Sequence, residues 1–405
     1  MTAIVAVELD RIYDSRGQPT VEASVRTRSG AVGRAGAPSG RSTGAHEVRA
    51  FPPGGVEEAI TTFRSHLAPR LLGADVTDQR GIDRLVHEVD GSATFGRIGG
   101  NTATAVSLAV ALAHAQSAHL PLWKVLLRPG LDGRSFPAIV GNCMNGGRHA
   151  VGGPDIQEFI AYAEDPDPAK SIPAALAVHE AIGEALHARF PSQALGRGDE
   201  GGWVAPLGNL GALEVLSKAC ETVRDRTHAK VYPGLDLAAS EFYRDGRYRY
   251  AEQTLDTEGQ VSFLASLVDR FGLRYLEDPF QEEEFEGFAR LTAQVGDRVR
   301  VVGDDLYCTA VPRVRVGLER RSSNAVLVKV NQVGTLSDAL DTVDLCREGG
   351  LATVTSHRSG DLPEGWLAHV AVASGAAGLK CGLLGGERVA KLNELLRVAA
   401  AVSAS

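Results

Sequence analysis

The runs VRVVGDDLY at residues 299–307 and NAVLVKVNQ at residues 324–332 decide the fold. Each is a short stretch rich in β-branched residues that leads into an amphipathic stretch, at residues 311–321 and 335–350. Similar strand-then-helix pairs begin at residues 273, 351 and 378. Because consecutive parallel strands need a helical crossover between them, this alternation predicts a parallel sheet covered by helices.

The length of this repeating region favours a closed barrel. Residues 136–405 come close to the ~250 residues typical of an eight-stranded α/β barrel. An open, doubly wound sheet is the rival fold for the same alternation. Residues 1–135 have a different order, with strands expected at 3–9 and 20–27 and helices at 56–72 and 101–117. Strands followed by helices predict a separate α+β domain, so we expect two domains, 1–135 and 136–405.

Composition excludes several classes of protein. The chain has 42 basic and 50 acidic side chains and a net charge of -8, which argues against a nucleic-acid binder. The sequence contains no run of about 18 apolar residues, the length needed to span a membrane, so no membrane-spanning helix is expected. Five scattered cysteines form no CxxC pair, so neither a disulfide framework nor a thiolate zinc site is expected. The N-terminal segment lacks a cleavable signal pattern, and we expect a cytoplasmic protein.

Six ionisable residues stand at the ends of strand-like runs. They are Asp236, Glu277, Asp304, Lys329, His357 and Lys380. In a barrel, the carboxyl ends of the strands form one rim, where catalytic residues lie. Taken alone, each of these residues could have a structural role instead of a functional one. The acids could cap a helix or lie in a solvated turn, a lysine could lie on the surface, and the histidine could be a hydrogen-bonded core residue. Their shared placement favours a site.

This set suits a magnesium-dependent proton abstraction. Asp236, Glu277 and Asp304 supply hard oxygen ligands, which Mg²⁺ prefers to zinc's sulfur and nitrogen donors. Beside a divalent cation, we expect like charge and desolvation to make the two lysines lower each other's pKa, so that one acts as a general base. A cation facing a substrate carboxylate would stabilise the enediolate formed when the adjacent carbon loses its proton.

A second group of polar residues lies early in the barrel region. Its members are His149, Gln157, Glu158, Asp199 and Glu200. Glu158 and Glu200 form a carboxyl pair that is able to share a proton, with one pKa raised by the other's charge. A base on one side and an acid on the other indicate a β-elimination.

A series of short sequence motifs, in the order in which they occur along the chain, matches the pattern of a known family. They include DSRGQPTVE (14–22), PSGRSTGAHE (38–47), NGGRHA (145–150), GDEGG (198–202), EDPF (277–280), GDDL (303–306), KVNQVGTL (329–336), SHRSG (356–360) and KLNELLR (391–397). With these motifs the chain resembles the enolase (phosphopyruvate hydratase) family over nearly its whole length. The resemblance implies an N-terminal α+β lid domain on a modified eight-stranded barrel, and a homodimer.

The resemblance also implies roles for individual residues. Asp236, Glu277 and Asp304 would bind the catalytic Mg²⁺, and Ser42 would help to hold a second Mg²⁺, making two per active site. Lys329 would be the base, and Glu200, supported by Glu158, would assist departure of the hydroxyl. Lys380 and the metals would neutralise the substrate carboxylate, Arg358 and Ser359 would hold the phosphate, and His149 would close over the substrate. Gln157 and His357 are further expected substrate-binding residues. Glu22 and Arg397 match residues that pair across the family's dimer.

Some positions depart from the family's pattern. They are Gln18, Arg41, Arg148, the segment DLPEG at 361–365 and the segment CGLLGG at 381–386. One hypothesis is that Arg41, with Arg148, binds a more anionic analogue of 2-phosphoglycerate. Such an analogue carries a carboxyl group on phosphorus, as in phosphonate biosynthesis. The alternative is that Arg41 points to solvent and the substrate is ordinary 2-phosphoglycerate. Two further classes stay open: a racemase or cycloisomerase of the wider superfamily, and a non-catalytic binding paralogue.

Overall fold

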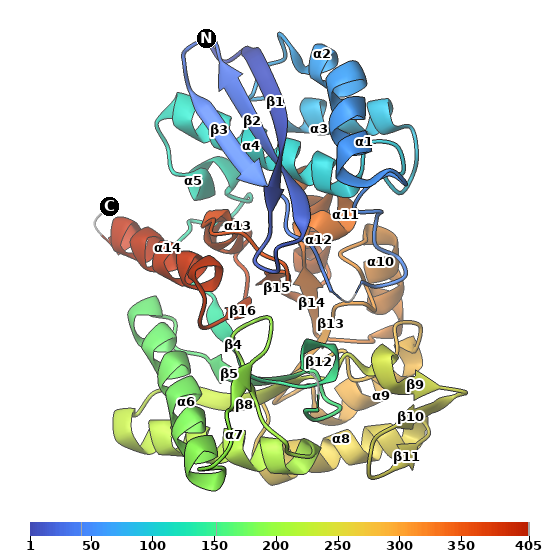
Figure 1. Cartoon of the computed structure of the whole chain (residues 1–405), viewed down its shortest axis with the longest axis vertical. Coiled ribbons are helices and arrows are strands. Elements are labelled where there is room, and N and C mark those ends of the chain that lie inside the picture. The colour runs from blue at the N-terminus through green and yellow to red at the C-terminus, as the bar shows by residue number, and fades with distance from the viewer. Residues whose placement is uncertain (42, 151, 404–405) are drawn as a thin grey trace.

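The N-terminal part of the chain is built on a small antiparallel sheet. The computed structural model describes residues 1–41, 43–150 and 152–403, and Figure 1 shows this sheet above the rest of the molecule. Its strands pair in the order β1–β2–β3, with bounds Ile4–Tyr13, Pro19–Thr27 and Val32–Gly36. The first two strands are those expected from the sequence, whereas β3, only five residues long, was not expected.

Helices cover one face of this sheet. The expected helix at 56–72 is present as α1 (Gly55–Thr62), a π-helical turn (Phe63–Leu67) and α2 (Ala68–Leu71). The others are α3 (Gln79–Asp90), α4 (Gly100–Ala118) and α5 (Leu122–Leu126). α4 packs directly on β2 and β3. Its alanine-rich composition lets the helix and the sheet approach closely, so a Cβ on Gly33 would lie 1.9 Å from the carbonyl oxygen of Ala109.

The rest of the chain forms a closed eight-stranded barrel. Its strands in ring order are β4 (Ala138–Asn145), β5 (Glu158–Ala163), β8 (Val231–Asp236), β12 (Tyr275–Glu277), β13 (Arg300–Gly303), β14 (Ala325–Val328), β15 (Ala352–Ser356) and β16 (Gly378–Gly382). β16 pairs with β4 and closes the ring, which confirms the barrel and excludes the open doubly wound sheet. Two short strands, β7 (Trp203–Val204) and β6 (Gly196–Arg197), extend this sheet beside β4. Strands β9 (Tyr243–Arg244), β10 (Arg247–Arg249) and β11 (Thr254–Leu255) form a separate three-stranded sheet.

The expectation of an all-parallel sheet was wrong for one strand. β5 runs antiparallel to both β4 and β8, whereas the pairings from β8 through β16 to β4 are parallel. β4 and β5 are joined by residues 146–157, and the described part of this connection, 146–150 and 152–157, holds the short 3-10 turn Gly147–His149 and no crossover helix. As a result it is the start of β5, not its end, that reaches the rim, and Glu158 pairs in register with Asp236.

Helices surround the barrel, and side chains fill it. The outer helices are α6 (Pro168–Arg189), α7 (Asn209–Thr227), α8 (Thr257–Phe271), α9 (Phe285–Val295), α10 (Val311–Arg320), α11 (Val330–Val333), α12 (Leu336–Glu348), α13 (Trp366–Ser374) and α14 (Gly386–Ser403). Inside, Val140, Ile160, Tyr275 and Leu327 belong to one buried cluster, so the barrel is a packed core. No helix among the described residues is long and apolar enough to cross a membrane.

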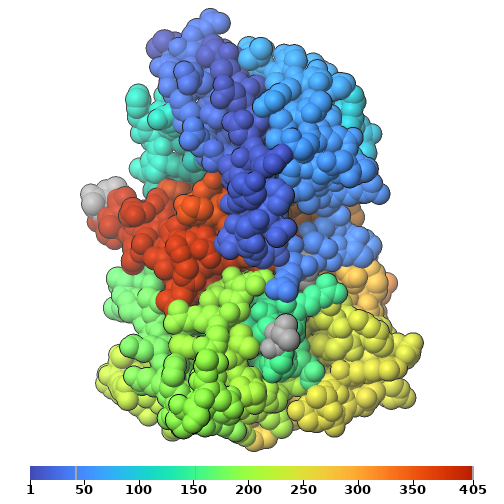
Figure 2. Space-filling model, in the orientation of Figure 1, coloured from blue at the N-terminus to red at the C-terminus, as the bar shows by residue number. Residues whose placement is uncertain are grey.

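The N-terminal sheet reaches down to the barrel rim. Figure 2 shows the blue lower end of the sheet lying against the red and orange C-terminal part of the chain. Ser39 forms an isolated antiparallel bridge with Gly360, and the backbone amide of Ser15 donates to the carbonyl oxygen of Asp361 at 2.9 Å. The turn and loop of the N-terminal part therefore form one wall of the rim.

Candidate active site

The six strand-end residues lie at one rim of the barrel. Asp236 and Glu277 are the last residues of β8 and β12, and Asp304, Lys329 and His357 directly follow β13, β14 and β15, while Lys380 lies within β16. The structure thus brings together all six residues that the sequence pattern placed at one mouth.

Lys380 is the centre of a buried ion-pair network. Its Nζ lies 2.8 Å from Oδ2 of Asp236, 2.6 Å from Oε1 of Glu277 and 3.5 Å from Oε1 of Glu158. The hydroxyl of Tyr275 donates to the other oxygen of Glu277 at 2.6 Å. Burial, and then the charge of Asp236, raises the pKa of Glu277 to about 8. Buried carboxylates are costly unless positive charge lies close to them, so this cluster needs a lysine or a cation nearby.

Lys329 is held by Asp304 on the neighbouring strand. The two side chains form a short ion pair, and Nε2 of Gln332 donates to the other carboxylate oxygen of Asp304 at 3.0 Å. Burial lowers the pKa of Lys329, but the charge of Asp304 outweighs it, and the net pKa is raised. Lys380 lowers the pKa of Lys329, as expected, but in this arrangement the charge of Asp304 outweighs that effect. The lowering expected beside a divalent cation stays a prediction.

The three predicted metal ligands provide a suitable donor set for Mg²⁺. Asp236, Glu277 and Asp304 end adjacent strands and are all buried, and their oxygens are hard donors. Asp304 also belongs to a group with Asp278 and Asp305, whose ligand atoms lie within 4.8 Å of one another. Asp278, however, already accepts the backbone amides of Asp304 and Asp305, both at 2.8 Å, and so braces the turn after β13.

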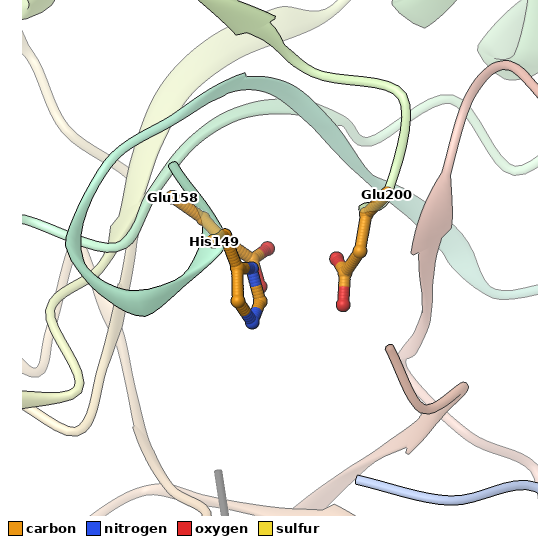
Figure 3. A group of neighbouring side chains, drawn as sticks. All are labelled: His149, Glu158 and Glu200. Atoms are coloured by element: carbon orange, nitrogen blue, oxygen red, sulfur yellow. The ribbon is translucent and has the colours of Figure 1, made fainter. Parts of the chain in front are cut away.

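Glu158 and Glu200 face each other across the cavity, as predicted for a carboxyl pair. Figure 3 shows the two carboxylates separated by an open space, with the ring of His149 beside Glu158. These three side chains place ligand atoms within 4.8 Å of one another, and Nδ1 of His149 lies 3.7 Å from Oε1 of Glu158. Within the described residues, Oε2 of Glu158 and Oε1 of Gln157 are buried without a hydrogen-bond partner, as expected of groups that await a ligand.

The two carboxyls differ in acidity. Burial, and then the charge of Glu200, raises the pKa of Glu158 well above its ordinary value. Burial acts in the same direction on Glu200, but His357 and His149 oppose it, and the pKa of Glu200 is lowered. Asn142 also donates to Oε2 of Glu200 at 3.1 Å. A proton on this pair is therefore favoured on Glu158 over Glu200.

The expected phosphate-side residues adjoin the loop from the N-terminal part. Both terminal nitrogens of Arg358 donate to Glu47, at 2.9 and 3.1 Å, and one also donates to Asn331 at 3.0 Å. The hydroxyl of Ser359 accepts the backbone amide of Arg41 at 2.7 Å. Arg358 and Ser359 thus tie residues 41–47 to the barrel rim. Ser42, predicted to bind the second Mg²⁺, lies outside the described residues.

The two unusual arginines each pair with an acid. Nη1 of Arg41 donates to Oδ2 of Asp199 at 2.6 Å, and Nε of Arg148 lies 2.5 Å from Oε2 of Glu241. Both arginine side chains are about half exposed, at 44% and 54%. Arg41 therefore does not simply point to solvent: it bridges the N-terminal loop to the loop that carries Glu200.

A small polar cavity lies among these groups. It has a volume of about 30 Å³ and touches residues from both parts of the chain, with Gly40, His149, Gln157, Glu158, Glu200, Asp236, Asp304, Lys329, Ser356, His357, Arg358, Ser359 and Lys380 in its wall. A larger cavity of about 530 Å³ shares His149 with it and opens past Arg41 and Asp199. Since the inner cavity is so small, the lysines and carboxylates must separate before a phosphorylated acid enters.

Several residues at the site were not predicted from the sequence. Glu47 and Gln332 occur within the quoted motifs PSGRSTGAHE and KVNQVGTL, so the motifs themselves were the available signal. Asp278 occurs within the quoted motif EDPF, but its positive φ of 39°, unusual for a residue with a side chain, was not predicted. Arg388 lies near the start of an amphipathic helical pattern, which gives no sign of its contacts with the site.

Comparison with known proteins decides the family. Residues 4–126 match the model for the enolase N-terminal domain, and residues 134–405 match the model for the enolase C-terminal TIM barrel domain. The chain belongs to the enolase family. A relative named enolase from Methanothermobacter thermautotrophicus is 45% identical over 97% of this chain and 95% of its own length. Those from Halorubrum lacusprofundi and Thermoplasma acidophilum are 42% and 41% identical, each over 98% of this chain and 99% and 98% of their own lengths.

Proposed function

We propose that this chain removes water from 2-phosphoglycerate and produces phosphoenolpyruvate. Membership of the enolase family makes it a carbon–oxygen lyase of the hydro-lyase type. The observation that carries the finer proposal is the position of the base and the acid. In the ring of eight strands, β14 and β5 lie four strands apart in either direction, so Lys329 and Glu158 approach the cavity from opposite sides.

The proposed reaction uses these two sides in turn. Lys329, as the neutral amine, takes the proton from the carbon that bears the phosphate, and the electrons of that C–H bond form the new C=C bond. The C–O bond to the hydroxyl then breaks, and a proton from the Glu158–Glu200 pair converts the leaving hydroxide to water. His149 lies against this pair and closes the hydroxyl side, while Arg358 and Ser359 bind the phosphate, which stays on the product.

Asp236, Glu277 and Asp304 would hold the catalytic Mg²⁺ and Ser42 would help to hold a second, with Lys380 and Gln157 beside the substrate carboxylate. Bound Mg²⁺ would supply positive charge that competes with the lysines for these carboxylates and would stabilise an enediolate. The three acids lie on adjacent strands and are buried, which supports this assignment. His357 contacts Glu200 and is proposed to act through it.

The charges at the rim favour 2-phosphoglycerate as substrate over the analogue with a carboxyl group on phosphorus. The analogue would need additional unpaired positive charge at the rim. Arg41 and Arg148 are each neutralised by an acid of this chain, Asp199 and Glu241. Neither arginine therefore offers a free charge to a second anionic group.

We also propose that residues 1–135 act as a lid domain and that residues 136–405 form the catalytic domain. The protein is further proposed to be a cytoplasmic homodimer. In the single chain, Glu22 pairs with Arg34 at 3.4 Å and Arg397 with Glu394 at 2.6 Å. In a dimer we expect both residues to exchange these neighbours for partners across the interface.

The test is a direct assay of dehydration. The protein is incubated with 2-phosphoglycerate and Mg²⁺, and the ultraviolet absorbance of the enolpyruvate product is followed. We expect a steady rise that stops when a chelator removes the metal. A protein that racemises or rearranges substrates would give no conjugated product, and the absence of a rise at any Mg²⁺ concentration would refute the proposal.

A further inference from the structure

Arg388 joins two catalytic loops from a position inside the protein. It lies near the start of α14, and its side chain is 0% exposed. Nη1 donates to the carbonyl oxygen of Arg358 at 2.6 Å, and Nη2 donates to the carbonyl oxygens of Ser359 at 2.6 Å and Asp199 at 3.2 Å. One guanidinium group thus holds both the loop that carries Glu200 and the loop that carries the phosphate-side residues.

The same guanidinium also contacts the ring of His357. Nη1 lies 2.7 Å from Nδ1 of His357. An arginine carries only donors and does not lose its proton in proteins, so Nδ1 has to be the acceptor. In the neutral ring the proton must then be on Nε2, which lies 3.2 Å from Oε2 of Glu200. Burial lowers the pKa of His357 to about 4, so the ring is neutral at ordinary pH.

The structure also shows what would replace Arg388. Oδ2 of Asp361 lies 4.0 Å from Nδ1 of His357, too far for a hydrogen bond, and Nη1 of Arg388 contacts both atoms, at 3.1 Å and 2.7 Å. Without the guanidinium, this carboxylate is the nearest acceptor for a proton on Nδ1. The proton would then move to Nδ1, and Nε2 would turn a lone pair toward the carboxylate of Glu200.

We infer that Arg388 is a positioning residue that fixes the tautomer of His357, so that the proton is on Nε2, the ring nitrogen that lies 3.2 Å from Glu200. The inference rests on the proposed function for the role of Glu200, but the tautomer itself does not depend on it. Among the described residues, His357 is the cavity side chain to which Arg388 hydrogen-bonds, and the positive charge of Arg388 also helps to lower the pKa of Glu200.

Lys391 provides a matched control on the same helix. It is also buried, and its Nζ lies 2.9 Å from the same oxygen of Asp361. Its other hydrogen bonds go to the carbonyl oxygens of Leu362, Glu364 and Glu387, at 2.9, 3.1 and 3.0 Å. A Lys391→Met variant therefore loses a buried cation and a partner of Asp361 without losing a contact to His357.

The first measurement uses the unaltered protein. Nitrogen-15 NMR of histidine-labelled protein distinguishes a protonated from an unprotonated ring nitrogen, and a His357→Gln variant identifies the signals of this residue. We expect an unprotonated Nδ1 and a protonated Nε2. A protonated Nδ1 overturns the inference, whether or not any variant folds and whether or not the protein dehydrates 2-phosphoglycerate.

The second measurement compares variants. Arg388→Met should show the opposite tautomer of His357 and a kcat for 2-phosphoglycerate lowered about 10–100-fold, the usual effect of losing such a supporting partner. Arg388→Lys, which still donates to Nδ1, should restore the tautomer and part of the rate, and Lys391→Met should leave the tautomer unchanged. If Arg388→Met keeps the original tautomer, or loses no more activity than Lys391→Met, the inference is wrong. An inactive parent protein with the expected tautomer would refute the proposed function alone.

Discussion

At the scale of single residues, the chemistry depends on how a few buried charges are compensated. Lys329 and Lys380 are both held by carboxylates, and the pKa of each is raised although burial acts in the opposite direction. Both lysines are thus protonated in this arrangement. Proton abstraction requires that their carboxylate partners be drawn away first.

Replacing the proposed base should abolish turnover while leaving the fold intact. Lys329→Ala should lower kcat for 2-phosphoglycerate by at least about 100-fold, since general bases contribute roughly 10²–10⁴-fold. Lys218→Ala is the control, because Lys218 is exposed on α7 and pairs only with Glu221 at 3.2 Å among the described residues. Circular dichroism would establish that both variants fold. Activity in Lys329→Ala within a few-fold of the control would contradict the assignment.

Arg41 gives a test of substrate choice. Because its charge is already paired with Asp199, Arg41→Ala should change kcat/KM by the same factor for 2-phosphoglycerate and for the analogue carboxylated on phosphorus. Steady-state kinetics with both compounds measure the two ratios. A loss at least about tenfold larger for the analogue, worth about 1.4 kcal/mol, would show that Arg41 selects the more anionic substrate.

At the scale of elements, strand direction determines which residues meet. The sequence predicted the positions of the strand-end residues, because the carboxyl ends of parallel barrel strands all lie at the same rim. These residues include Asp236, Glu277, Asp304 and Lys329. The sequence did not predict the reversal of β5, since the run that begins at Glu158 contains no signal for strand direction. That reversal is nevertheless what brings Glu158 beside Asp236.

Close packing of β3 on α4 should be sensitive to a single methyl group. A Cβ on Gly33 would lie 1.9 Å from the carbonyl oxygen of Ala109 and 2.3 Å from the amide nitrogen of Ala113. Backbone atoms of a buried helix cannot easily move, so Gly33→Ala should lower the free energy of unfolding by about 3 kcal/mol, the upper end for overpacking.

Urea denaturation would measure this loss. Gly386→Ala is the control, because nothing lies within 4 Å of its Cβ position and its backbone is not left-handed. Its free energy of unfolding should stay within about 0.5 kcal/mol of the parent. Equal stability of Gly33→Ala and Gly386→Ala would show that the sheet and helix are less tightly packed than described.

At the scale of the whole molecule, the site exists only where the N-terminal part meets the barrel. Arg358 and Glu47 are 311 residues apart in the chain, and Arg41 and Asp199 are 158 apart. Contacts of this kind have no local pattern, which is why sequence reasoning identified the strand-end residues but not Glu47, Asp278 or Arg388. The motif resemblance supplied Arg358 and Ser359, whose surroundings only the fold reveals.

Glu364 links the same two parts and should make stability depend on pH. Its carboxylate accepts the backbone amide of Gly36 in β3 at 2.9 Å and the indole N–H of Trp366 at 2.7 Å. Burial raises its pKa to about 7, above the ordinary value of 4.5. The folded state therefore binds this proton more tightly than the unfolded state, so stability falls as pH rises from about 4.5 to about 7.

Comparison with Glu364→Gln isolates this effect. The variant keeps an acceptor for the amide of Gly36 but has no carboxyl to ionise. Relative to the variant, the parent should lose on the order of 1–3 kcal/mol of unfolding free energy between pH 5 and pH 8. Thermal or urea unfolding at both pH values gives the difference, and a difference that does not change with pH would refute the prediction.

The central claim is that a base on one side of the barrel and an acid pair on the other divide the elimination between them. The most direct measurement is exchange of the α-proton of 2-phosphoglycerate in deuterated water with Mg²⁺, followed by NMR alongside product formation. Glu200→Gln should still exchange this proton while forming product at least about 100-fold more slowly, and Lys329→Ala should do neither. Exchange at the parent rate in Lys329→Ala would contradict the account.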